Sequence, residues 1–185
     1  MDDSREDIRR NRNIWAPWRM QYVSSIGPDG PDGGCFLCRN RDEKEDERNL
    51  VLWRGRRAFA MLNLFPYVGG HAMVAPYEHV GGLDALDEPT LLELMTQARD
   101  LRAVLSKALD ADGFNVGINL GRCAGAGLPG HLHVHVVPRW RGDTNFIPVL
   151  ADVRVIPVSL EEVYDLVRGT ADELGLPNLP SAEGR

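Results

Sequence analysis

The sequence predicts an α+β fold in which a mostly antiparallel sheet of about five strands packs against one long helix. Short apolar runs alternate with turns rich in glycine and proline, a pattern typical of antiparallel strands. Residues 88–109 instead repeat leucine and alanine at helical spacing. The 185 residues, of which 43% are hydrophobic, suffice for one domain. We expect that domain over residues 14–175, a flexible charged arm at 1–13 and a loose tail at 176–185.

The expected elements follow one another in hairpin order. Pro89 suits the first turn of the long helix, and a second helix is expected at residues 159–174. The charged run at residues 39–48 is expected to be a solvated loop or a short helix. The expected strands cover residues 50–53, 58–62, 71–76, 114–120 and 131–138.

Composition and charge exclude several classes of protein. The chain has 21 basic and 27 acidic residues, a net charge of -6, which argues against general nucleic-acid binding. No apolar run approaches the roughly 20 residues of a membrane span. The N-terminus is charged and lacks an apolar signal core, so we expect a cytoplasmic protein. The three cysteines of the chain do not make a disulfide framework.

The most informative segment is His131-Leu132-His133-Val134-His135-Val136-Val137. Because strand side chains alternate between two faces, it would place three imidazoles in a row on one face and apolar residues on the other. Such a row suits either a catalytic zinc site built on His131 and His133 or nucleophilic catalysis by the middle histidine. The glycine-rich loop at 121–130 matches no Walker or G-x-G-x-x-G pattern, yet its backbone N–H groups suit phosphate, which favours phosphorus chemistry.

Cys35-Phe36-Leu37-Cys38 is a C-x-x-C pair that suits either half a zinc site or a redox pair. A redox pair normally opens a helix in a βαβ unit, and the sequence indicates no such unit. Zinc needs two more ligands, and Cys123 and the histidines are the candidates.

The segment 131–137 fits the signature of the histidine triad family, His-φ-His-φ-His-φ-φ with φ apolar. Residues 59–79 resemble that family's first hairpin, and residues 115–121 resemble the strand before its phosphate loop. Residues 15–20 and 138–146 resemble a bacterial branch labelled diadenosine tetraphosphate hydrolase or phosphorylase. The resemblance covers roughly residues 14 to 168.

The resemblance implies cleavage of dinucleoside polyphosphates through a nucleotidyl-histidine intermediate. His133 would attack the α-phosphorus, His135 would donate to the phosphate or the bridging oxygen of the leaving group, and water or phosphate would be the acceptor. The side-chain amides of Asn63 and Asn119 would bind on the ribose and phosphate sides. The implied substrate-binding residues are Asn63, Asn119, Ala126, Gly127, Arg139 and Trp140.

One position departs from the family pattern. Many relatives carry Ser or Thr in the loop where this chain has Gly127, so a hydroxyl donor is missing. The backbone N–H groups around Ala126 and Gly127 would then stabilise the phosphoryl oxygens. Arg139 could attract a polyanionic substrate, and Trp140 could stack on a base.

In zinc-bearing relatives, two N-terminal cysteines join a histidine after the hairpin and the first triad histidine. These correspond to Cys35, Cys38, His79 and His131, a closed Cys₂His₂ site for structural Zn²⁺. His71 is either a partner that orients a catalytic imidazole or an ordinary hydrogen-bonded histidine.

Relatives pair their sheets, so a homodimer is expected. Three alternatives stay open at this point: a nucleoside phosphoramidase of the same family, a zinc-water hydrolase, and a nucleotide-binding regulator with little turnover. A sugar-phosphate acceptor is disfavoured, because relatives that use one typically carry Gln where this chain has His135.

Overall fold

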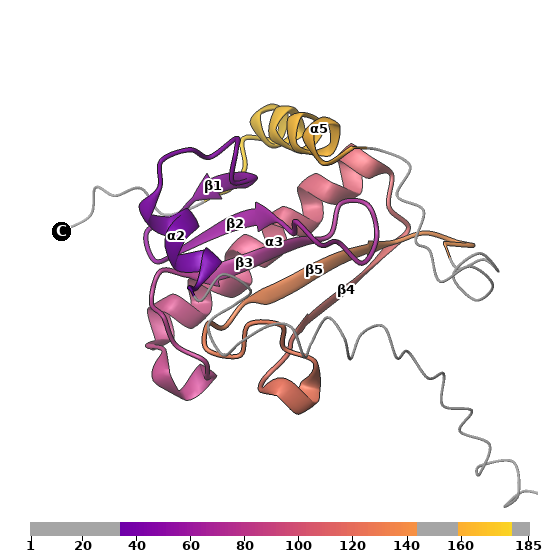
Figure 1. Ribbon diagram of the computed structural model, residues 1–185. Coiled ribbons are helices and arrows are strands. Elements are labelled where there is room, and N and C mark those ends of the chain that lie inside the picture. Colours follow the sequence, from indigo (N-terminus) through magenta and orange to yellow (C-terminus); the bar gives the residue numbers. More distant parts are fainter. Residues whose placement is uncertain (1–33, 144–158, 179–185) are drawn as a thin grey trace, which may run out of the picture.

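The structure is a computed structural model that describes residues 34–143 and 159–178 (Figure 1). The expected arm at 1–13, the tryptophan-containing stretch at 15–20 and most of the expected tail lie outside the described residues. Within that tail, the N–H of Asn178 donates to Oδ2 of Asp100, 2.9 Å away on the long helix.

One five-stranded antiparallel sheet forms the centre of the domain, which confirms the predicted fold class. The strands lie in the order β1-β2-β3-β5-β4, so β1 and β4 are its edges. They are β1 (Val51–Arg54), β2 (Ala58–Leu62), β3 (Ala72–Pro76), β4 (Gly113–Ile118) and β5 (Val134–Arg139).

Two helices cover one face of the sheet, as Figure 1 shows. Helix α3 (Glu88–Leu109) has the predicted bounds, because the Asp87 side chain caps its first turn beside a proline. Helix α5 (Leu160–Leu174) packs against α3 and β1, and Ser159 begins it with a capping box. The short 3₁₀ turns η2 (Leu83–Ala85) and η3 (Arg122–Ala124) lie in loops.

The opposite face carries a third helix, α2 (Phe36–Asp42). Ala60, Val74 and Val136 belong to the larger core cluster under α3 and α5. The intervening Met61 and Met73 form a second cluster with Leu37, which is fully buried. His135 pairs with Met73 in register, so it lies on the α2 side of the sheet.

Strand β5 begins three residues later than expected, which corrects the prediction of a strand at 131–138. If the ladder continued past Val134 toward His131, β5 would next pair with Ala75 and Pro76 of β3. Proline has no N–H to continue the ladder. His131 and His133 therefore precede the strand. The predicted alternation persists all the same, because Leu132 packs into the core cluster of Val134.

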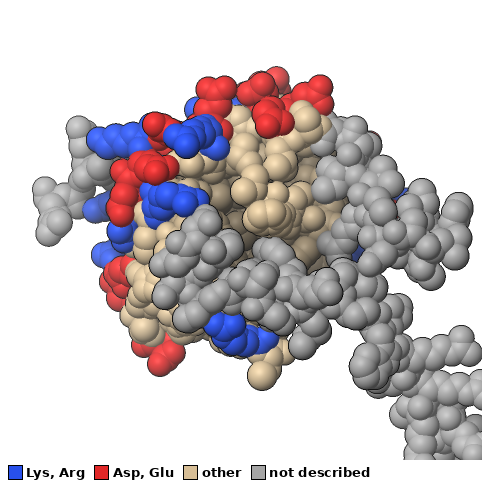
Figure 2. Space-filling view, viewed as in Figure 1, with Lys and Arg blue, Asp and Glu red and all other residues tan. Residues whose placement is uncertain are grey.

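Charged side chains gather along α5 and over α2 on the face seen in Figure 2, while the surface over the sheet between them is largely uncharged. Among the described residues, none of the helices is both long and apolar enough for a membrane span.

Candidate active site and metal centre

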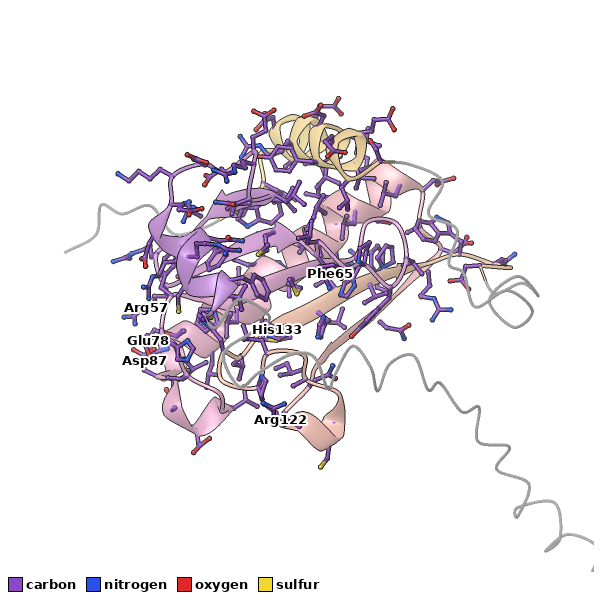
Figure 3. All side chains as sticks on the ribbon, viewed as in Figure 1. Arg57, Phe65, Glu78, Asp87, Arg122 and His133 are labelled. Carbon is purple, nitrogen blue, oxygen red and sulfur yellow. The ribbon has the colours of Figure 1, made fainter. Side chains whose placement is uncertain are left out.

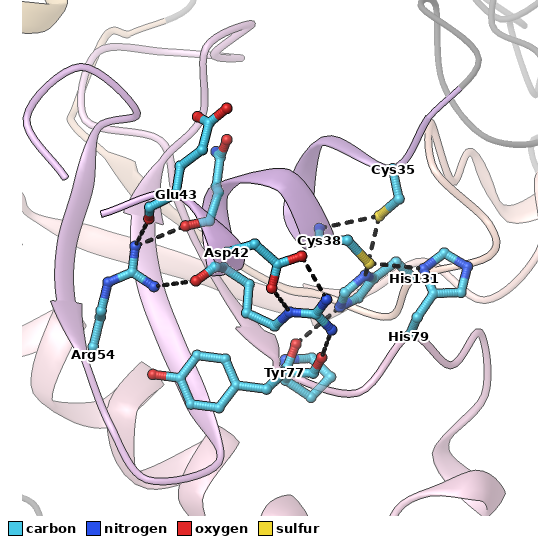
Figure 4. A network of polar contacts seen from close by, with 11 residues as sticks. Cys35, Cys38, Asp42, Glu43, Arg54, Tyr77, His79 and His131 are labelled. Carbon is cyan, nitrogen blue, oxygen red and sulfur yellow. Dashed lines mark hydrogen bonds and ion pairs between the residues drawn. The ribbon is translucent and has the colours of Figure 1, made fainter. Parts of the chain in front are cut away.

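Two cysteines and two histidines meet on the α2 side of the sheet. The ligand atoms of Cys35, Cys38, His79 and His131 all lie within 4.8 Å of one another. Cys35 Sγ is 3.1 Å from Nδ1 of His131, and Cys38 Sγ is 3.2 Å from Nδ1 of His79 (Figure 4). The structure thus brings together all four predicted ligands, which form a possible metal site.

The tautomer of His131 fits metal binding. Its Nε2 lies 2.9 Å from the carbonyl oxygen of Pro76, which can only accept, so Nε2 carries the proton and donates. The lone pair of Nδ1 then points toward the two sulfurs. Burial lowers the pKa of His131 to about 4, so the ring is neutral at pH 7. Four protein ligands of this kind leave no open position, which is typical of a structural site.

The cysteine pair opens a helix, which the sequence did not indicate. Cys35 is the N-cap of α2, where its Sγ accepts from the N–H of Cys38 at 3.4 Å. The described strands are all antiparallel, so this helix belongs to no βαβ unit there. The surroundings are therefore those of a metal site more than of a redox helix.

The tautomer of His133 leaves a lone pair on its Nε2 nitrogen. Its Nδ1 donates to the carbonyl oxygen of His131 at 2.9 Å, so the proton is on Nδ1 and the lone pair is on Nε2. The side chain is buried, and burial lowers the pKa of His133 below 6.5. A neutral imidazole with a free Nε2 is a competent nucleophile at neutral pH.

A chain of hydrogen bonds fixes the opposite tautomer in His135, with the proton on Nε2. The N–H of Tyr67 donates to Nδ1 of His71 at 3.1 Å, so His71 carries its proton on Nε2. That Nε2 donates to Nδ1 of His135 at 2.9 Å, which leaves the His135 proton on Nε2. Of the two interpretations of His71, the structure supports a partner that orients a triad imidazole.

Nε2 of His135 is the sole buried side-chain nitrogen or oxygen in the described part of the chain that lacks a hydrogen-bond partner. Burial lowers the pKa of His135 to about 4, and its ring packs edge-on at 4.7 Å from that of His133. A buried N–H without a partner is costly, so this one is available to a bound oxygen.

The glycine-rich loop lies at the same end of β5 as His133, as the labels of His133 and Arg122 in Figure 3 show. Asn119 donates to the carbonyl of Gly125 at 3.4 Å, and the N–H of Ala126 donates to Gly121 at 3.3 Å. Of the two expected backbone donors, the N–H of Gly127 alone has no hydrogen bond within the described residues.

Asn63 joins the site through His71, whose Nδ1 lies 3.3 Å from the Asn63 amide nitrogen. Arg139 and Trp140, by contrast, lie at the other end of β5 from His133. Arg139 binds Asp143, and Trp140 Nε1 donates to the carbonyl of Leu109 at 3.1 Å. The structure does not bring these two beside the triad, and their substrate contacts stay predictions.

Sequence reasoning missed the groups that fix the tautomers. They are the N–H of Tyr67 and the carbonyls of Pro76 and His131. Backbone groups carry no residue-type signal, so only the fold reveals them. Arg54, which binds the end of α2, was missed because its position in a charged turn resembles an ordinary surface site.

Residues 44–142 match the family described as HIT domain, and the chain belongs to this histidine triad family. It is 38% identical over 167 residues to the AP-4-A phosphorylase of Mycobacterium tuberculosis, covering 88% of this chain and 84% of that protein.

Two further similarities are informative. The bis(5'-nucleosyl)-tetraphosphatase [asymmetrical] of Schizosaccharomyces pombe is 37% identical over 93 residues, which cover 50% of each chain. The crystal structure of a Zn-bound histidine triad family protein from Mycobacterium smegmatis superposes with a TM-score of 0.62 at 26% identity. That superposition covers 76% of this chain and 95% of the other.

Proposed function

We propose that this protein is an enzyme that cleaves dinucleoside polyphosphates of the diadenosine tetraphosphate type by nucleotidyl transfer through His133. The observation that carries the proposal is the pair of opposite tautomers in the triad. His133 offers a lone pair on Nε2, while the neighbouring His135 offers an unpartnered N–H. A nucleophile and a hydrogen-bond donor side by side suit displacement at phosphorus.

In the first step, Nε2 of His133 attacks the α-phosphorus, and the bond from that phosphorus to the bridging oxygen breaks. Nε2–H of His135 donates a hydrogen bond to the bridging oxygen, and this stabilises the negative charge that develops there as the nucleoside polyphosphate departs as an anion. The carbonyl of His131 stabilises the cationic ring that forms on His133. The N–H of Gly127, which has no hydrogen bond within the described residues, would donate to a phosphoryl oxygen.

In the second step, an acceptor attacks the same phosphorus and His133 leaves. His133 departs as a neutral imidazole with its proton on Nδ1, His135 keeps its Nε2–H throughout, and a proton on the acceptor passes to solvent. Water as acceptor yields a nucleoside monophosphate, and inorganic phosphate yields a nucleoside diphosphate. The relative matched over most of both chains is named AP-4-A phosphorylase, which supports phosphate as the acceptor.

We further propose that Cys35, Cys38, His79 and His131 hold a structural Zn²⁺. Bound zinc would supply a crosslink between α2, the loop after β3 and the segment just before β5. The Zn-bound neighbour of known structure supports this choice of metal. His133 is not in the ligand group, which favours nucleophilic catalysis over the zinc-water alternative.

The expected homodimer is also retained as a proposal. Strand β4 is an edge of the sheet, and its residues Asn115, Val116 and Gly117 are exposed. An exposed edge strand is suited to pairing with a second copy. Light scattering should give twice the chain mass, and Val116→Lys should lower it by placing a charge at the edge.

Product analysis tests the function. The zinc-loaded protein is incubated with diadenosine tetraphosphate, with and without inorganic phosphate, and nucleotides are separated by chromatography. ADP and ATP that form only with phosphate identify a phosphorylase, and AMP with ATP in its absence identifies a hydrolase. Adenosine phosphoramidate, run in parallel, tests the phosphoramidase alternative. Tight adenine-nucleotide binding without turnover of either compound would overturn the proposal in favour of a binding regulator.

A further inference from the structure

Arg54, the last residue of β1, binds the C-terminal end of helix α2. Its guanidinium donates to the carbonyls of Asn40, Arg41 and Glu43 at 2.7, 3.0 and 2.9 Å. Figure 4 shows these contacts at one end of the helix and the sulfurs of Cys35 and Cys38 at the other. One arginine therefore holds the short element that carries half of the metal ligands.

The last carbonyls of a helix have no partner within it, and its C-terminal end carries partial negative charge. A planar guanidinium with five N–H groups satisfies several of these oxygens at once. Asp46 fixes the guanidinium in turn, since its carboxylate accepts from Nη2 at 2.7 Å and from Nε at 3.0 Å. Only 25% of the Arg54 side chain is exposed.

Helix α2 depends on such outside contacts because it has only seven residues. Helices this short are not stable by themselves in water. Two other contacts attach it to the sheet. Leu37 is fully buried in the cluster with Met61 and Met73, and Nη1 of Arg41 donates to the carbonyl of Tyr77 at 2.9 Å. All these contacts are independent of a metal ion.

We propose that Arg54 is a positioning residue for the metal centre. It holds α2 so that Cys35 and Cys38 face His79 and His131 before the ion arrives, and it thereby sets the metal affinity. The inference rests on the proposed zinc site. Metal binding to a preformed site costs less ordering of the chain than binding that must also fix a helix.

The test compares two arginines that each bind backbone carbonyls: Arg54 binds the end of α2, and Arg168 binds β1. Arg54→Met removes the contacts to α2. Arg168→Met is the matched control, because Arg168 lies on α5 and donates to the carbonyl of Leu52, away from α2. The zinc dissociation constant is measured on the full chain by competition with a chromophoric chelator, and Co²⁺ absorption reports the ligand geometry. Thermal melting of the metal-free proteins records the loss of stability.

We expect Arg54→Met to weaken zinc binding about 10- to 100-fold, as is usual for groups that support metal ligands. Arg168→Met should lower the melting temperature but leave the dissociation constant within about twofold of wild type, since it touches no part of α2. If Arg54→Met binds zinc as tightly as Arg168→Met does, the positioning role is wrong.

The metal site itself is tested separately by the wild-type protein and Cys35→Ala. One equivalent of zinc in the wild type, lost in Cys35→Ala, supports the site whatever the Arg54 result. No stoichiometric zinc in the wild type overturns the site and this inference with it. Should Arg54→Met not fold, Arg54→Lys replaces it, because one ammonium cannot bind three carbonyls in the fork geometry. Unchanged zinc affinity in Arg54→Lys then overturns the proposal.

Discussion

His131 and His133 are two residues apart, yet the structure prepares them for different chemistry. Each ring donates one hydrogen bond to a backbone carbonyl. Nε2 of His131 donates to the carbonyl of Pro76, and Nδ1 of His133 donates to the carbonyl of His131. The opposite nitrogen therefore carries a lone pair in each case. The lone pair of His131 Nδ1 faces the sulfurs of Cys35 and Cys38, whereas that of His133 lies on Nε2, within the triad. The position of one carbonyl thus decides which ring nitrogen carries the lone pair, and we propose that this separates a metal ligand from a nucleophile.

The largest expected effect separates the two histidines by function. His133→Ala should lower kcat by about 10⁴-fold or more, because removal of a covalent nucleophile removes the two-step path. Its zinc content should equal that of wild type, since His133 is not among the four ligands. Steady-state rates and metal analysis of the same preparation check both statements.

The reciprocal control is Cys35→Ala, which should lose zinc and melt at lower temperature while His133 is retained. A His133→Ala protein that keeps a near-normal rate would contradict the assignment of the nucleophile. A His133→Ala protein that loses its zinc would contradict the separation of the two sites.

The next effect concerns the hydrogen-bond donor of the triad. His135→Gln should slow the chemical step by about 10²- to 10³-fold, the usual value of one donor to a developing charge, with little change in substrate binding. His71→Gln should give a smaller loss of kcat, because His135 stays in place while its tautomer is no longer fixed. Single-turnover kinetics measure both. A His135→Gln variant altered only in KM would show that His135 binds substrate and does not stabilise the transition state.

Burial lowers the pKa of His135 from 6.5 to about 4, so this ring, together with His131, makes stability depend on pH. Between these values the unfolded chain binds more protons than the folded one, so stability falls as the pH drops from 6.5 toward 4. The loss due to His135 at full effect is about 3 kcal/mol. Denaturant unfolding at pH 7 and pH 4 should show this loss in wild type and less of it in His135→Gln. Equal losses in both proteins would exclude His135 as its source.

The smallest effect concerns the phosphate loop. A Cβ at Gly127 would meet no atom within 4 Å, so a serine fits and restores the hydroxyl found in many relatives. Gly127→Ser should raise kcat/KM by up to about 10-fold over Gly127→Ala, the value of one added hydrogen bond. Equal rates in the two variants would mean that the position lies too far from the phosphate.

Much of the fold was predictable because its signals are local. The bounds of α3 follow from helical periodicity with Pro89 in the first turn, and the capped start of α5 was within one residue of its prediction. The start of β5 was not predictable, since it depends on pairing with Pro76, a residue far away in sequence.

The site likewise has parts that the sequence predicts and parts that only the fold reveals. The four residues that the resemblance implied as metal ligands lie together, and the rings of His133 and His135 are neighbours. The tautomers, and the attachment of α2 by Arg54, depend on carbonyl groups that only the folded chain brings near. Residue identity therefore indicates which side chains meet, and the backbone decides what each can do.

The most direct test is native mass spectrometry of the zinc-loaded protein, rapidly mixed with diadenosine tetraphosphate and quenched during turnover. Both modifications are read on the same molecules: one zinc ion, and one covalent adenylyl group that maps to His133 after digestion. We predict zinc and adduct in wild type, zinc without adduct in His133→Ala, and adduct without zinc in any Cys35→Ala protein that stays folded. Turnover in wild type without a covalent adduct, abolished at once by a chelator while the fold persists, would contradict the account and favour zinc-bound water as the nucleophile.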